Sequence, residues 1–190
     1  MIIESISNII GNYIISNCSI DESNKENVIY ALEAILGELF KIIVLLLIFL
    51  ILHKSKFFIF SLLILISIRI FSGGIHLKTF NQCLLFSAFV FILTALISPS
   101  IPKMNSGIYY GIAIFDILSI SIKSPCPNKK RPIKNFNRFI YLKILSIFFT
   151  ILWIWTLFFY ITDDSLFNCG LATITVQSIQ LVLSKKEVLI

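Results

Sequence analysis

The sequence predicts an all-α membrane protein, a polytopic bundle of about six hydrophobic helices, four to six of them spanning, plus an N-terminal interfacial amphipathic helix. Hydrophobic residues make up 57% of the 190 residues and charged residues only 14%. The mean hydropathy of +0.94 is far too high for a soluble domain of this length. We therefore expect one membrane-embedded domain over residues 1–190. Nothing in the composition supports nucleic-acid binding.

Residues 1–17 carry apolar side chains at three- and four-residue spacing, which is the period of one helix face. The apolar positions are Ile2, Ile3, Ile6, Ile9, Ile10, Tyr13 and Ile14. This pattern is typical of a helix that lies in the membrane interface. The alternative is that the same apolar face packs against the bundle. The segment lacks the basic leader and the cleavage site of a secretory signal.

A long apolar helix is expected over residues 23–52, because Ser23 and Glu26 have the spacing of a capping box. Three charged residues interrupt its first half, namely Glu33, Glu38 and Lys41. Charged side chains at membrane depth are costly and tend to face a partner or a cavity. The two glutamates could pair with Arg69 or orient His76. Alternatively, the helix still lies in the interface there and they are solvated.

Five further hydrophobic segments follow, over residues 57–71, 84–98, 107–122, 144–161 and 166–183. Asp116 lies near the centre of the third of these, and a lone acid at that depth usually faces the bundle interior. It could orient a histidine, or it could pair with Arg69 or with a hydroxyl group. The last two segments are predicted to be scaffold.

The distribution of basic residues predicts the orientation of the chain. Residues 123–143 contain no acid and seven basic residues, which are Lys123, Lys129, Lys130, Arg131, Lys134, Arg138 and Lys143. Basic loops stay on the cytoplasmic side, so this loop, the stretch 69–83 and both termini are predicted to be cytoplasmic. Lys54 and Lys56 would then lie outside. That conflict leaves open a re-entrant second apolar run, or a Gly73-Gly74 region that dips into the bilayer.

The stretch 68–83, IRIFSGGIHLKTFNQC, contains the residues for thiol chemistry. His76 could deprotonate Cys83 and make it a nucleophile. On one straight helix, seven residues separate the two by roughly 10 Å, beyond the roughly 3–4 Å that proton transfer requires. Gly73-Gly74 could break the helix and let His76 fold back, or the pair could form between two subunits. The alternative is an inert buried cysteine and a histidine that serves as a polar anchor.

Four cysteines are present, at positions 18, 83, 126 and 169. They are far apart and form no C-x-x-C pair, so neither a zinc site nor a disulfide framework is predicted. No metal and no cofactor is expected. Cys83 is the one cysteine with a histidine at a suggestive spacing.

The combination of Arg69, Gly74, His76 and Cys83 resembles the signature of the AgrB family, membrane cysteine endopeptidases of Gram-positive quorum-sensing systems. Residues 124–133, SPCPNKKRPI, resemble the family's proline-bounded Lys-Lys-x-Pro-Ile loop. Residues 30–33, YALE, are similar to its Tyr-Gly-Leu-Glu stretch. Two positions depart from the pattern, since Ala31 replaces glycine and Cys126 stands where a small residue such as alanine is more usual.

The resemblance implies a cell-membrane enzyme that cuts the C-terminal tail from a short AgrD-like propeptide. Cys83 would form an acyl-enzyme, with His76 as the base, and a thiol of the substrate would release a thiolactone ring. Arg69, Gly74 and Glu33 would be supporting residues. Arg69 could bind a substrate carboxylate or stiffen the turn, and its spacing from His76 favours stiffening; the alternative is an anchor at the membrane surface. The resemblance also implies a homodimer in contact with membrane lipid.

The basic residues Lys129, Lys130 and Arg131 would dock the acidic substrate tail, although fixing the orientation of the chain already explains them. A second functional class remains open, a non-enzymatic peptide exporter or channel subunit. That alternative gives Cys83 no role and predicts that Cys83→Ala keeps function.

Overall fold

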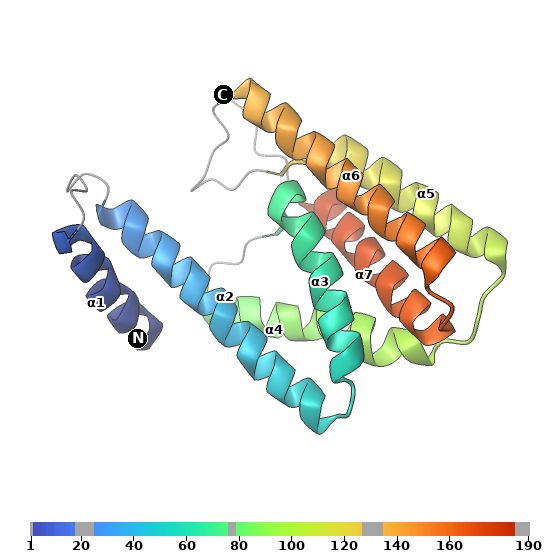
Figure 1. The fold of residues 1–190 in the computed structure, drawn as a ribbon, viewed down its shortest axis with the longest axis horizontal. Helices are drawn as coiled ribbons and strands as arrows, with labels where there is room; N and C mark the ends of the chain where they lie inside the picture. Colours follow the sequence, from blue (N-terminus) through green and yellow to red (C-terminus); the bar gives the residue numbers. More distant parts are fainter. Residues whose placement is uncertain (1, 18–24, 76–78, 127–134, 185–190) are drawn as a thin grey trace. The chain divides into compact units, whose positions relative to one another are not determined.

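The computed structural model describes residues 2–17, 25–75, 79–126 and 135–184, and these residues are almost entirely helical (Figure 1). The helices are α1 (Ile2–Asn17), α2 (Lys25–Ile51), α3 (Ser55–Ser72), α4 (Phe80–Phe91), α5 (Ser106–Lys123), α6 (Phe136–Tyr160) and α7 (Asp164–Leu183). A π-helical stretch, η2 (Ile92–Ile97), and a 3₁₀ turn, η3 (Ser98–Ser100), continue α4. Six of the described segments are long and apolar enough to cross a membrane. The all-α membrane fold is confirmed.

Most of the observed helices begin and end close to their predicted boundaries, and the largest difference is at α6. This helix begins at Phe136, eight residues before the predicted start at residue 144. The side chain of Asn135 accepts a hydrogen bond from the backbone N–H of Asn137 at 2.9 Å and caps the helix. The basic side chains of Arg138 and Lys143 therefore lie on helix rather than loop, as long cationic side chains near a membrane interface can.

The described chain divides into two compact units, residues 1–51 and 52–190. In the first unit α1 packs against α2 through its small residues. Ser7 is fully buried, and a Cβ on Gly11 would lie only 2.8 Å from Ile29 Cγ1. Ile9 and Tyr13 on the apolar face remain 70% exposed. The face predicted to enter the interface is thus not the face that contacts α2.

Glu38 and Lys41 form an ion pair within α2, with 2.6 Å between Oε1 and Nζ. The lysine side chain is only 5% exposed, whereas that of the glutamate is 65% exposed. Glu33, five residues before Glu38, is half-buried. The first unit therefore compensates its buried cation locally.

In the second unit α7 is the central helix, in contact with α3, α5, α6, η2 and η3 (Figure 1). More than half of its span is buried. A buried hydroxyl cluster joins it to two neighbours, because Ser61 Oγ lies 2.9 Å from Thr94 Oγ1 and 2.8 Å from Thr173 Oγ1. Interhelical hydrogen bonds of this kind contribute about 0.6 kcal/mol each in membrane proteins. The position of α7 agrees with its predicted role as scaffold, and the sequence did not indicate that it is the central helix.

At one end of the second unit, two ion pairs join the start of α7 to the start of α3 and to the segment before α5. Lys103 Nζ lies 2.9 Å from Asp164 Oδ1, and Lys56 Nζ lies 3.5 Å from Asp163 Oδ2. The hydrogen bond and the charge of Asp164 raise the pKa of Lys103. Desolvation acts to raise the pKa of Asp163, but hydrogen bonds from the backbone of residues 165 and 166, together with Lys56, lower it overall. We call this the Asp163 end.

Candidate functional site

The opposite end of the second unit contains the turn that leaves α3. The helix ends at Ser72 because Gly73 adopts a φ of +74°, a conformation that favours glycine. The Gly73 N–H still donates to the Arg69 carbonyl oxygen at 2.9 Å. The next helix begins only at Phe80. The predicted helix break at Gly73-Gly74 is therefore present, and Cys83 lies on the next described helix.

A second chain segment pairs with this turn. The backbone N–H of Cys126 donates to the Ser72 carbonyl oxygen at 2.9 Å, and Gly73 and Cys126 form an isolated parallel β-bridge. A Cβ on Gly73 would collide with the Cys126 carbonyl oxygen. The close approach of the two backbones therefore requires glycine at position 73. We call residues 72–75 the exit turn.

Arg69 stabilises the exit turn from the last turn of α3. Its Nη2 donates to the Ile75 carbonyl oxygen at 3.0 Å, and its Nη1 donates to Gln180 Oε1 at 3.1 Å. One guanidinium thus bridges the exit turn and α7. This geometry fits the predicted stiffening role better than the binding of a substrate carboxylate, because two of the donors are already engaged.

Gln177, one helical turn before Gln180 on α7, contacts the same segment. Its Nε2 donates to Ser72 Oγ at 2.9 Å and to the Gly73 carbonyl oxygen at 2.8 Å. Both glutamines are at least 97% buried. Sequence analysis missed both of them. The available signal was two glutamines three residues apart in an apolar span, since buried amides there need partners.

Cys83 lies in the first turn of α4. Thr79 caps this helix, and its Oγ1 accepts a hydrogen bond from the Gln82 N–H at 3.3 Å. Cys83 is partly exposed, whereas the other two described cysteines, Cys126 and Cys169, are buried. Cys83 is therefore the most accessible of the described thiols.

Several predicted site residues lie outside the described residues. These are His76 and the basic residues Lys129, Lys130 and Arg131. The distance between His76 and Cys83 is consequently not defined, and the dyad stays a prediction. Gly74 is buried beside Arg69, where a Cβ would be 3.5 Å from the guanidinium carbon, an ordinary contact.

Asp116 takes the hydroxyl partner that was one of its predicted alternatives. Thr175 Oγ1 lies 2.9 Å from Asp116 Oδ2, and the acid is fully buried between α5 and α7. Its other oxygen, Oδ1, has no hydrogen-bond partner among the described residues. Asp116 thus connects two helices of the bundle.

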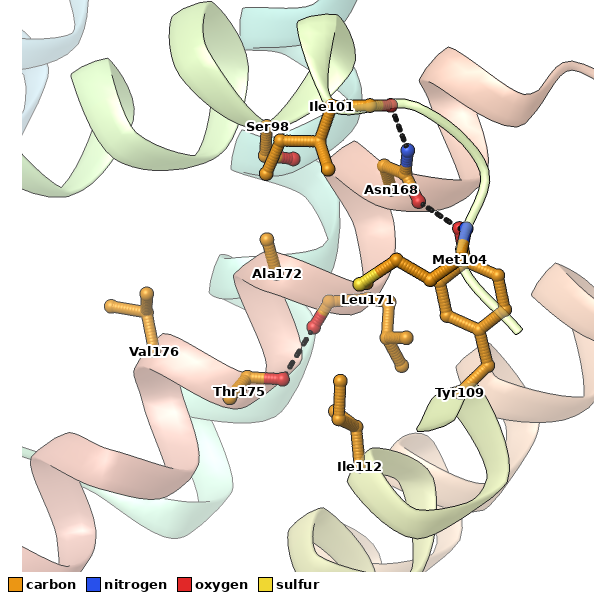
Figure 2. Close-up of a pocket in the computed structure, with 10 residues that line it drawn as sticks. All are labelled: Ser98, Ile101, Met104, Tyr109, Ile112, Asn168, Leu171, Ala172, Thr175 and Val176. Carbon is orange, nitrogen blue, oxygen red and sulfur yellow. Dashed lines mark hydrogen bonds between the residues drawn. The ribbon is translucent and has the colours of Figure 1, made fainter. Parts of the chain in front are cut away.

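A cavity of about 220 Å³ opens beside the first half of α7 (Figure 2). Its lining is mostly apolar, with the polar side chains of Ser98, Tyr109, Asn168 and Thr175. Asn168 ties two of its walls together, since its Nδ2 donates to the Ile101 carbonyl oxygen and its Oδ1 accepts from the Tyr109 hydroxyl, both at 2.8 Å (Figure 2). Among the described residues, none that was predicted for thiol chemistry lines this cavity.

These features define a multi-pass helical membrane protein with an arginine-braced turn between its second and third candidate spans. The family model for accessory gene regulator B matches residues 7–181, and the chain belongs to the AgrB family. It is 36% identical over 171 residues to a putative AgrB-like protein of Clostridium beijerinckii. The matched region covers 88% of this chain and 82% of that relative. No solved structure matches the chain. The resemblance inferred from the sequence is confirmed.

Proposed function

We propose that this AgrB family member is a membrane cysteine endopeptidase that processes a short AgrD-like propeptide for quorum sensing. The observation that carries the proposal is Cys83, the partly exposed thiol among the described cysteines, at the start of the helix that follows the exit turn. The positive end of a helix dipole favours an anion at such a position. His76 precedes that helix in the sequence by four residues.

The chemistry follows from a thiol and a base. His76 takes the proton of Cys83, and the sulfur attacks a carbonyl carbon of the propeptide. His76 then gives the proton to the leaving amine as the C–N bond breaks, which leaves a thioester on Cys83 and frees the tail. A thiol of the substrate attacks this thioester, forms the thiolactone and returns Cys83 to its thiol form. Exclusion of water would protect the thioester from hydrolysis.

The basic residues after Cys126 would bind the tail of the propeptide. Lys129, Lys130 and Arg131 begin three residues after Cys126, which is bridged to the exit turn. A tail rich in acids would bind there while the bond near Cys83 is cut. If so, a peptide with a neutral tail should have a higher KM, and a KM that does not change would reject this docking role.

The test uses the full chain in liposomes with a synthetic peptide that has an amphipathic start, one central cysteine and an acidic end. Wild type should release the tail and carry a peptide adduct on Cys83, seen by mass spectrometry. A peptide with alanine in place of its central cysteine cannot cyclise. It should therefore raise the amount of peptide adduct on Cys83 or give a linear product. Cys83→Ala should yield neither tail nor adduct.

Cys126→Ala is the matched control, because it removes another thiol and alters no backbone contact of the exit turn. It should cut like wild type. Cleavage that survives in Cys83→Ala would overturn the proposal. Transport of the intact peptide by both proteins, with no cleavage, would favour the alternative, a non-enzymatic exporter. Cross-linking in native membranes tests the homodimer that the proposal includes.

A further inference from the structure

Two buried glutamines of α7 support the exit turn through opposite chemistry, Gln177 directly and Gln180 through Arg69. Gln177 acts through its N–H donors, which bind Ser72 Oγ and the Gly73 carbonyl oxygen. Gln180 acts through its carbonyl oxygen, which accepts from Arg69. A guanidinium can only donate hydrogen bonds, so the amide orientation of Gln180 is fixed by its partner.

The two contacts restrain neighbouring parts of one short segment. Gln177 restrains the carbonyl of residue 73 directly. Gln180 restrains Arg69, which in turn restrains the carbonyl of residue 75. Residue 75 directly precedes His76 in the sequence. The backbone of Cys126 secures the other side of the turn at Ser72.

We infer that Gln177 and Gln180 are positioning residues that set the exit turn, and with it the placement of His76 relative to Cys83. This inference rests on the proposed function, and it adds α7 to the parts of the chain on which that function depends. Neither glutamine is expected to contact substrate, because both are at least 97% buried.

Within the part of the chain that the structure describes, each of the two buried amides has one group that is hydrogen-bonded and one that is not. Gln177 Oε1 and Gln180 Nε2 have no hydrogen-bond partner among the described residues, although unpaired buried amide groups are costly. A helix selected for packing alone would carry apolar side chains here. Two amides that are only half satisfied, both directed at the exit turn, are best explained by the contacts that they do make.

The same substitution should therefore have opposite effects at the two positions. Gln180→Glu keeps an oxygen that accepts from Arg69, so it should react like wild type. Gln177→Glu replaces donors by oxygens that face the Gly73 carbonyl, so it should lose the contact. Gln177→Met and Gln180→Met keep a similar shape without hydrogen bonds, and both should place the exit turn less well than wild type. They keep the inference testable if Gln177→Glu fails to fold.

The readout is the rate at which iodoacetamide alkylates Cys83 in the full chain in liposomes, followed by mass spectrometry of the peptide that contains it. The rate at pH 7 is divided by the rate at pH 10, where a thiol with an ordinary pKa of about 8.5 is ionised, so that changes in access cancel. A free thiol is only a few per cent ionised at pH 7. Loss of a working base should therefore lower the ratio, by up to about 30-fold.

His76→Ala tests the proposed function separately from the positioning role of the two glutamines. If it leaves the ratio unchanged, His76 does not activate Cys83 and the proposed function fails. If it lowers the ratio, the positioning role requires that Gln177→Glu and both methionine variants lower it too, while Gln180→Glu retains it. Equal behaviour of the two glutamate variants would overturn the inference. Ser178→Ala, which removes a hydroxyl bonded to the Ile174 carbonyl of α7 itself, is the control and should keep the wild-type ratio.

Discussion

At the scale of single residues, Gly73 and Gly74 are neighbours in sequence but differ in what they require. Gly73 has a φ of +74° and no space for a Cβ beside Cys126. Gly74 has neither constraint, since a Cβ there would make only ordinary contacts with Arg69. Sequence analysis selected Gly74 through the family resemblance. It could not see the steric demand at Gly73, because the paired segment lies more than 50 residues away in the chain.

Gly73→Ala should therefore destabilise the second unit far more than Gly74→Ala. A non-glycine residue in such a conformation costs about 1–3 kcal/mol, and the collision with the Cys126 carbonyl adds to this cost. Unfolding of both variants in detergent, followed by tryptophan fluorescence, measures the difference. Equal midpoints for the two variants would show that the turn relaxes around a Cβ.

At the scale of elements, the apolar runs located all six candidate spans, because lipid exposure requires about 20 apolar residues in sequence. The sequence did not reveal which helix is central. A surface helix shows a single apolar stripe, whereas α7 has polar side chains on several sides. A helix surrounded by polar partners shows such a pattern, but so does an irregular surface helix. The partners Ser61, Arg69 and Asp116 come from α3 and α5, which no local pattern connects to α7.

The N-terminus of α7 gives a prediction about pH. The carboxylate of Asp163 caps the helix by accepting from the N–H groups of Ser165 and Leu166. Its pKa is lowered in the folded protein from an ordinary value of 3.8. The stabilisation is thus complete above that ordinary value and is lost as the pH falls through the lower folded pKa.

Asp163→Asn keeps a capping side chain but cannot titrate. Its thermal midpoint in detergent should fall less than that of wild type between pH 5 and pH 2. Asp163→Ala should have a lower midpoint throughout, because it removes the cap as well. If wild type and Asp163→Asn lose stability in parallel, the carboxylate does not contribute to the acid sensitivity of the bundle.

At the scale of the whole molecule, the second unit resolves much of the charge conflict seen in the sequence. The exit turn and the end of α5 lie at one end, and Lys56 and Lys103 lie at the Asp163 end. Two lysines there are paired with Asp163 and Asp164, whereas the basic residues near the start of α6 have no acid near them in sequence. Because basic residues favour the cytoplasmic side whether or not acids lie nearby, the seven basic residues of 123–143 outweigh Lys54, Lys56 and Lys103. The end with the exit turn should therefore be cytoplasmic.

Impermeant thiol reagents applied to intact cells can test this orientation. Thr162 and Asn137 are both exposed and lie at opposite ends of α6. Thr162→Cys should react from outside in intact cells, and Asn137→Cys should react only after the membrane is permeabilised, with mass spectrometry locating each adduct. The reverse result would place the exit turn outside, where Cys83 could not meet a propeptide made in the cytoplasm. Labelling of both cysteines from one side would mean that α6 does not cross the membrane, and the number of spans would be lower than six.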